Sequence, residues 1–98
     1  MIGTVSKQPN ETYPISADFT KRLKGGETIN AVTISAKKVA DGSDTSTLLS
    51  GPTFTATVAQ VRLATGGTVG DDHIVQFRVT TTAANVYEAE VGLAIREE

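Results

Sequence analysis

Cysteine and tryptophan are absent from this chain of 98 residues, and its aromatic side chains are limited to two tyrosines and three phenylalanines. Without cysteine there can be no disulfide, thiolate metal site or cysteine nucleophile, so the fold must stand without covalent cross-links. With so few rings, the core must be built mainly from Val, Ile, Leu and Ala. Such a core leaves little surplus over the conformational entropy that folding costs, and the length predicts one domain.

An excess of charge of either sign is also missing, as are long apolar runs. Nine basic and eleven acidic residues give a net charge of -2, without the basic excess that nucleic-acid binding requires. No segment approaches the roughly 20 apolar residues of a membrane span, and the opening residues MIGTVSKQPNETYP lack the apolar stretch of an export signal. We therefore expect a soluble protein that binds neither nucleic acid nor membrane.

The chain has a single histidine, His73, in the segment GGTVGDDH (66–73), and no catalytic motif surrounds it. The glycine spacing fits neither a dinucleotide-binding turn nor a P-loop, and no G-x-S-x-G sequence is present. Asp71, Asp72 and His73 cannot all converge on one ion, because neighbouring side chains of a strand point to opposite faces. We expect no catalytic residue, cofactor or metal site, with a weak calcium site of loop carbonyls and one Asp as the alternative. The segment is interpreted as a turn between strands.

Thr and Val recur in short runs that are separated by Gly, Pro, Asn and Asp, which is typical of an all-β domain. Apolar alternation predicts strands over 12–19, 28–39, 54–63, 73–81 and 87–96. Pro14 places the first of these at a sheet edge, the second has a bulge near residues 30–32, and the third is divided or bulged near Ala59–Gln60. The pattern predicts an immunoglobulin-like antiparallel β-sandwich of about seven strands over residues 11–98, preceded by a flexible arm over residues 1–10.

The last two predicted strands alternate most clearly, so they define which side chains face the core. The inward residues are His73, Val75, Phe77 and Val79, followed by Tyr87, Ala89, Val91, Leu93 and Ile95. The outward residues of the last strand include Glu88, Glu90 and Arg96. All five aromatic rings fall at inward positions, which argues against an aromatic platform for sugars.

Three segments, taken in order along the chain, resemble a known family. In the first segment, YPISADFTKRLKGGETI, a proline-containing strand leads through a glycine pair into the second strand. The second segment, VRLATGGTVGDD, contains a glycine turn. The third segment, FRVTTTAANVYEAEVGLAIREE, is a closing hairpin that ends in a charged tail. This order resembles small bacteriophage virion proteins of the fiber-tail adaptor or immunoglobulin-like structural type. Members often carry an aromatic residue at the position of His73 and a glycine in the last hairpin, where this chain has Ala84–Asn85. Asn85 can supply the left-handed conformation there.

The resemblance implies a non-enzymatic building block of the neck, tail or fiber region that binds other virion proteins in a multi-copy assembly. Such a protein is located in the virion after assembly in the host cytoplasm. The predicted contact residues, apart from the N-terminal arm, are Leu48, Leu49, Glu88, Glu90 and Arg96. The Leu48–Leu49 pair either closes one end of the core or makes an exposed contact. The alternative function is a carbohydrate or cell-surface binding module, which would require exposed aromatic rings or a calcium site.

Overall fold

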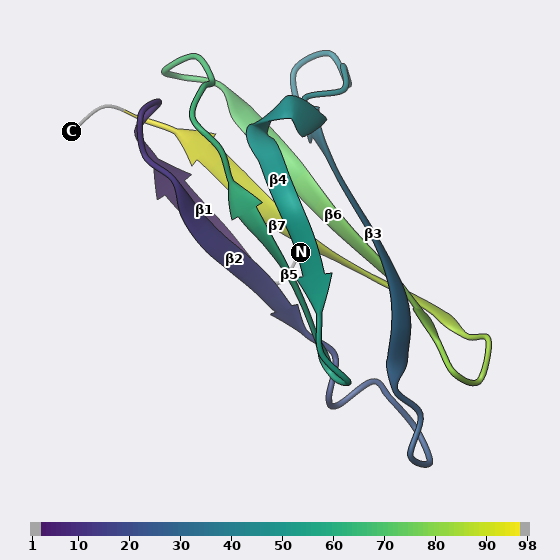
Figure 1. The fold of residues 1–98 in the computed structure, drawn as a ribbon. Helices are drawn as coiled ribbons and strands as arrows, with labels where there is room; N and C mark the ends of the chain where they lie inside the picture. The colour runs from purple at the N-terminus through teal and green to yellow at the C-terminus, as the bar shows by residue number, and fades with distance from the viewer. Residues whose placement is uncertain (1–2, 97–98) are drawn as a thin grey trace.

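The structure is a computed structural model that describes residues 3–96, and over these residues the chain forms seven β-strands (Figure 1). The strands are β1 (Gly3–Lys7), β2 (Tyr13–Asp18), β3 (Ile29–Lys38), β4 (Leu49–Phe54), β5 (Val58–Leu63), β6 (Asp72–Thr81) and β7 (Val86–Ile95). A single 3₁₀ turn, η1 (Ser46–Leu48), precedes β4 in this part of the chain. The predicted all-β fold is confirmed.

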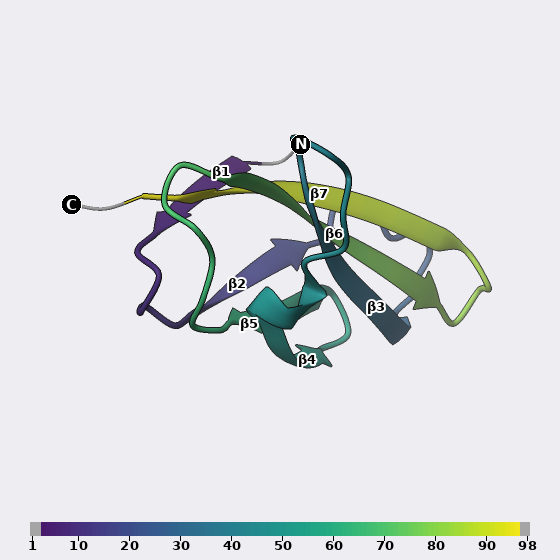
Figure 2. The same cartoon turned by 90° about the horizontal axis from the view of Figure 1, so that it is seen from above.

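The strands form two packed sheets, which Figure 2 shows as separate layers. The four-stranded sheet has the order β1-β7-β6-β3, and the three-stranded sheet has the order β2-β5-β4. The neighbours β3-β6-β7 and β2-β5-β4 have the order of strands CFG and BED in a constant-type immunoglobulin domain. The first strand differs, because β1 joins the four-stranded sheet and runs parallel to β7. The predicted sandwich is thus antiparallel in every pair of named strands except this one.

The N-terminal segment departs from the prediction of a flexible arm over residues 1–10. Residues 3–7 form β1, whose register with β7 runs from Gly3 opposite Val91 to Lys7 opposite Ile95. Only Val5 contributes an apolar side chain to the core from this strand, so hydrophobic alternation could not reveal it. Backbone hydrogen bonding to the edge of β7 orders the segment instead. Residues 1 and 2 of the predicted arm lie outside the described residues.

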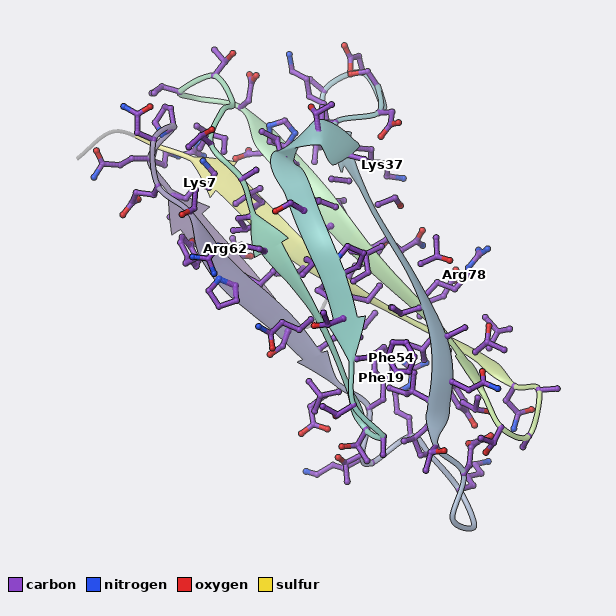
Figure 3. All side chains as sticks on the ribbon, viewed as in Figure 1. Lys7, Phe19, Lys37, Phe54, Arg62 and Arg78 are labelled. Carbon is purple, nitrogen blue, oxygen red and sulfur yellow. The ribbon has the colours of Figure 1, made fainter. Side chains whose placement is uncertain are left out.

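The core lies between the two sheets and follows the predicted alternation. The inward residues of β6 and β7 are buried from His73 to Val79 and from Ala89 to Ile95, while Tyr87 is half-buried. Ile15, Ala17 and Phe19 cover them from the other sheet, and Figure 3 labels Phe19 near the lower end of the sandwich. β2 is an edge strand, as Pro14 predicts, because proline has no N–H for a second neighbour.

The region predicted as one divided strand over 54–63 contains the end of β4 and the whole of β5. The interruption lies at residues 55–57, where the Thr55 N–H donates to the Val58 carbonyl at 2.8 Å, and the predicted position near Ala59–Gln60 is wrong. Ala59 instead lies inside β5 and is fully buried. Phe54 is 42% exposed rather than inward, because β4 changes register between Ser50 and Thr53 at the edge of its sheet.

Two local conformations test the predicted turns. The bulge predicted near residues 30–32 is confirmed by a register shift between Ile29 and Ala31. In the hairpin between β6 and β7, the left-handed residue is Ala84 (φ 64°), so its assignment to Asn85 is wrong. The Asn85 side chain is committed elsewhere, since its Nδ2 donates to Glu27 Oε2 at 2.6 Å. The turn therefore places the strain on Ala84.

Substitution of two glycines of the turn before β6 should separate backbone strain from steric clash. Gly67 and Gly70 both have φ of 95°, but a Cβ on Gly67 would lie 3.0 Å from the Ile95 side chain, whereas one on Gly70 meets open space. We expect Gly70→Ala to lower the free energy of unfolding by about 1–3 kcal/mol through strain alone. Gly67→Ala should cost roughly 1–3 kcal/mol more through overpacking. Urea denaturation measures both, and equal losses would contradict the predicted clash.

Candidate interaction site

Lys7 ends β1 with its side chain inside the protein, only 2% exposed. Nζ donates hydrogen bonds to the carbonyl oxygens of Gln8 (2.9 Å), Pro9 (3.2 Å) and Gly66 (3.1 Å). Burial lowers the pKa of Lys7 from its ordinary value, and the negative charge of Glu11 opposes this effect. The ammonium thereby ties the connection between β1 and β2 to the glycine turn that follows β5.

Glu27 is the buried charge at the other end of the sandwich, 8% exposed. Its Oε2 accepts hydrogen bonds from Thr81 Oγ1 and Asn85 Nδ2, each at 2.6 Å. Its Oε1 accepts from the Tyr87 hydroxyl at 3.0 Å and the Lys24 N–H at 3.1 Å. These donors, with Thr81 first among them, hold the pKa of Glu27 at about 2, against the opposing effect of burial. The carboxylate thus joins the β2–β3 connection to the β6–β7 hairpin.

Three of the predicted contact residues share the outer face of the four-stranded sheet. Glu88 pairs with Arg78 (Nη2 to Oε2, 2.7 Å), whose side chain projects away from the sandwich in Figure 3. Arg96 pairs with Asp72 (Nη2 to Oδ1, 2.8 Å). Glu90 lies opposite Gln76 in the register and makes no ion pair with any residue from 3 to 96. The structure therefore places Glu88, Glu90 and Arg96 along one surface, with Glu88 near the start of β7 and Arg96 just past its end.

A shallow groove of about 350 Å³ lies on this same outer face. It forms because β7 places Gly92 and Ala94 there, and both residues are small. Ile74 and Val39 are the larger apolar side chains that line the groove, and Val39 is 54% exposed. The outer face thus combines an apolar depression with the Arg96–Asp72 ion pair at its border.

The other two predicted contact residues, Leu48 and Leu49, lie on the opposite side of the sandwich. Leu48 is 6% exposed and belongs to the core. Leu49 is half-buried and packs against the same core. Of the two roles considered for this pair, closing one end of the core fits the geometry, and Leu48 has almost no surface to offer a partner.

The segment GGTVGDDH is fixed to the rest of the fold by backbone hydrogen bonds. The Gly66 N–H donates to the Pro9 carbonyl at 2.7 Å, and the Gly70 N–H donates to the Ile95 carbonyl at 2.8 Å. The Asp71 carbonyl in turn accepts from the Ile95 N–H at 2.9 Å. The interpretation of this segment as a turn that leads into a strand agrees with these bonds and with the start of β6 at Asp72.

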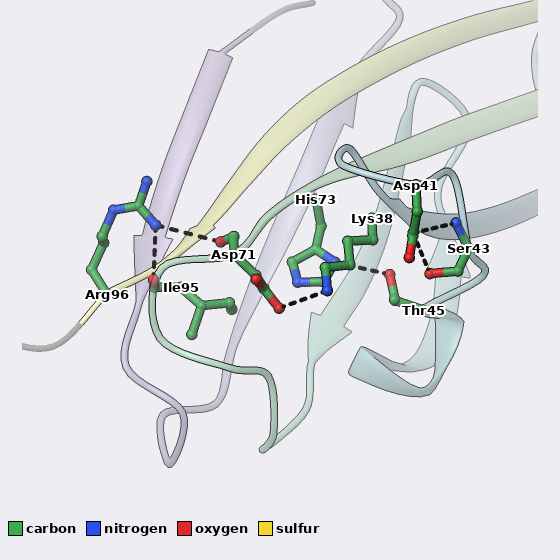
Figure 4. A network of polar contacts seen from close by, with 8 residues as sticks. All are labelled: Lys38, Asp41, Ser43, Thr45, Asp71, His73, Ile95 and Arg96. Carbon is green, nitrogen blue, oxygen red and sulfur yellow. Dashed lines mark hydrogen bonds and ion pairs between the residues drawn. The ribbon is translucent and has the colours of Figure 1, made fainter.

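His73 is buried on the core face of β6, as its inward position predicts, and is 4% exposed. Nδ1 shares a hydrogen bond of 3.0 Å with Thr45 Oγ1, whose direction depends on the tautomer. On the other side of the ring, Figure 4 shows the ion pair between Lys38 Nζ and Asp71 Oδ2, 3.4 Å apart. Burial is the main cause that lowers the pKa of His73, so the imidazole is neutral at pH 7.

Within residues 3–96, no group of three or more histidine, aspartate or glutamate side chains is placed to hold a metal ion. Over the same residues, no helix is long and apolar enough to cross a membrane.

Sequence reasoning missed both buried charges. For Glu27 a signal was present, because it lies two residues before the buried Ile29 and so could share its inward direction. For Lys7 the corresponding signal is weaker, since Val5 is the one apolar residue that shares its face in β1, and its partners are backbone carbonyls that only the folded chain brings together. A charge that is satisfied by backbone dipoles leaves no pattern in the side chains.

Removal of the Glu27 carboxylate should change the acid sensitivity of the fold. The pKa is about 2 in the folded protein and near its ordinary value of 4.5 in the unfolded chain, so the carboxylate stabilises the fold fully above about pH 4.5. This stabilisation is lost as the pH falls toward 2. In Glu27→Gln, the free energy of unfolding should be lower at pH 7 and should fall less between pH 4.5 and 2. Glu90→Gln is the charge-matched control, and identical pH profiles for both variants would contradict the role of Glu27.

His73 should give a second pH dependence in a higher range. Its folded pKa is lowered from the ordinary 6.5, so the unfolded chain takes up a proton more readily and stability falls as the pH drops below about 6.5. The loss is at most about 1.4 kcal/mol for each pH unit. His73→Phe keeps a buried ring and should abolish this slope between pH 6.5 and 5 in urea denaturation. A slope that persists in the variant would assign the effect to another group.

The comparison with known families addresses the chain as a whole. Residues 7–94 match the family described as podophage GP4 fiber-tail adaptor protein gp77. The match begins at the end of β1 and extends almost to the end of β7, so it covers both sheets. The sequence matches no curated protein. The resemblance inferred from the three segments is confirmed, and the chain belongs to the podophage fiber-tail adaptor protein family, whose members are structural adaptors of the virion.

Proposed function

We propose that this protein is a non-enzymatic adaptor that links fiber and tail proteins of a phage particle, and that several copies act in each assembly. The observation that carries this proposal is the family match over residues 7–94. The partners are other virion proteins, and the site of action is the virion after assembly in the host cytoplasm. Nucleic acid and membrane are not among the proposed partners.

The outer face of the four-stranded sheet is the proposed contact surface. It carries the groove floored by Gly92 and Ala94 and the charged residues Glu88, Glu90 and Arg96. Exposed apolar surface bordered by charges is typical of a protein contact site, because burial of the apolar part stabilises the complex while the charges select the partner. Leu48 is no longer part of the proposed surface, because it is buried.

The edge of β3 is a second place where a partner could add backbone contacts. The Ala36 N–H donates to Ser46 Oγ at 3.1 Å and its carbonyl accepts from the Thr45 N–H at 2.9 Å, so both groups point away from β6. Because direction alternates along a strand, the backbone groups of Val32 and Ile34 point the same way. Residues 43–46 already bond to this edge beside residues 36–38, but no named strand within residues 3–96 pairs with it, so residues 32–34 could accept an extended segment of a partner.

The proposal predicts that a charge reversal on the outer face weakens assembly. We expect Glu90→Lys to reduce the amount of this protein recovered in purified particles, because a partner group that complements the Glu90 carboxylate would then face a charge of its own sign. Gln60→Lys, on the exposed surface of the three-stranded sheet, is the control and should be incorporated normally. Quantitative immunoblotting of particles complemented with each variant measures the outcome. Normal incorporation of Glu90→Lys would exclude this face, and absence of the unmodified protein from particles would exclude the adaptor function.

A further inference from the structure

The second ring nitrogen of His73 is an anomaly in an otherwise well-bonded protein. Nε2 is buried and, alone among the buried side-chain nitrogen and oxygen atoms of residues 3–96, has no hydrogen-bond partner. A buried polar atom without a partner destabilises a fold, so its presence needs an explanation. The ring cannot turn to relieve this without losing the bond between Nδ1 and Thr45.

His73 lines a pocket of about 300 Å³ at the end of the sandwich where the loop after β3 meets the glycine turn. The other polar residues that line it include Lys38, Thr45, Thr47, Thr68 and Asp71. Figure 4 shows Nε2 on the side of the ring that faces away from Thr45 and toward the Lys38–Asp71 pair. The size lies at the lower limit of ligand sites and suits a single small group.

The charges that border the pocket are already balanced. Lys38 is paired with Asp71 at 3.4 Å, and Asp72 is paired with Arg96 at 2.8 Å. Asp41, which Figure 4 shows beyond Thr45, accepts hydrogen bonds from the N–H and hydroxyl of Ser43. An anion would be repelled by Asp71 and a cation by Lys38, so the pocket favours a neutral ligand.

The hydrogen-bonding groups of the pocket are mixed in kind. Asp71 accepts, Lys38 donates, and the hydroxyls of Thr47 and Thr68 can do both. Nε2 donates or accepts according to the tautomer that Thr45 selects. A carboxamide offers a carbonyl oxygen and two N–H donors on one small planar group, so it can satisfy either form of Nε2 together with Asp71 or Lys38.

We propose that this pocket receives the side-chain carboxamide of an asparagine or glutamine from a partner virion protein, and that the Lys38 and Asp71 side chains move apart so that the carboxamide reaches Nε2 of His73, which is buried in the free protein. The inference rests on the proposed adaptor function, because the partner protein presents the ligand. It adds a second attachment point, at the end of the sandwich, to the contact surface on the outer sheet face. The cost of the unpaired nitrogen in the free protein is recovered when the carboxamide binds, which favours the bound state.

The first test uses the unmodified protein, whose single histidine gives one set of imidazole signals in NMR spectra. Acetamide should shift the ¹⁵N resonance of Nε2 saturably, and by more than acetate, methylammonium or glucose at the same concentration. The absence of a saturable shift would mean that the pocket holds no more than solvent, and the proposal would be wrong. A larger effect of glucose would replace the carboxamide with a sugar hydroxyl, and a larger effect of acetate would replace it with an anion.

The second test measures incorporation into particles. Thr68→Val removes an exposed hydroxyl from the pocket, and His73→Phe removes Nε2, so each should reduce incorporation about 3–10-fold in line with the loss of one hydrogen bond. Thr53→Val, on the exposed surface of the three-stranded sheet, is the control. Normal incorporation of Thr68→Val and His73→Phe would overturn the pocket while the adaptor function stands. Failure of the unmodified protein to enter particles would overturn the adaptor function itself.

Discussion

The fold depends on the requirement that a buried charge keep its hydrogen-bond partners. Lys7 at one end and Glu27 at the other are buried and have no salt-bridge partner among residues 3–96, and each is hydrogen-bonded to neutral groups from several segments. If one of these connections moved away, a charge would lose its hydrogen-bond partners, which would destabilise the fold. The two charges therefore hold together the loops of a sandwich whose core contains few aromatic rings.

This constraint also positions the candidate sites. Because Lys7 binds the Gly66 carbonyl, the glycine turn is held against the body of the protein, and this fixes the position of His73 at the start of β6. At the other end, Glu27 fixes the hairpin between β6 and β7, from which Glu88 and Glu90 extend along the outer face. A rigid scaffold beneath a contact surface reduces the entropy that ordering would cost on binding.

Much of the sandwich could be predicted from the sequence, because side-chain alternation along β2, β6 and β7 records which face is buried. β1 could not, since it is ordered by backbone bonds to β7 and its side chains are mostly polar. Phe54 was misplaced because a register change in an edge strand does not alter the residue pattern. The outward direction of Glu88, Glu90 and Arg96 followed from alternation, whereas the burial of Leu48 depends on the path of η1 and was one of two possibilities. The pocket at His73 is lined by segments that are distant in sequence, so no local sequence pattern could predict it.

The parallel pairing of β1 with β7 has a mechanical consequence. The chain enters β1 at Gly3 and leaves β7 at Ile95, and the two strands run in the same direction side by side. A pull on Gly3 against Ile95 would therefore load the five paired residues of β1 along the strand axis and together, rather than opening them one at a time. Shared loading in shear resists rupture better than sequential unzipping does. A domain with this strand pairing is suited to bear tension that is applied between its two ends.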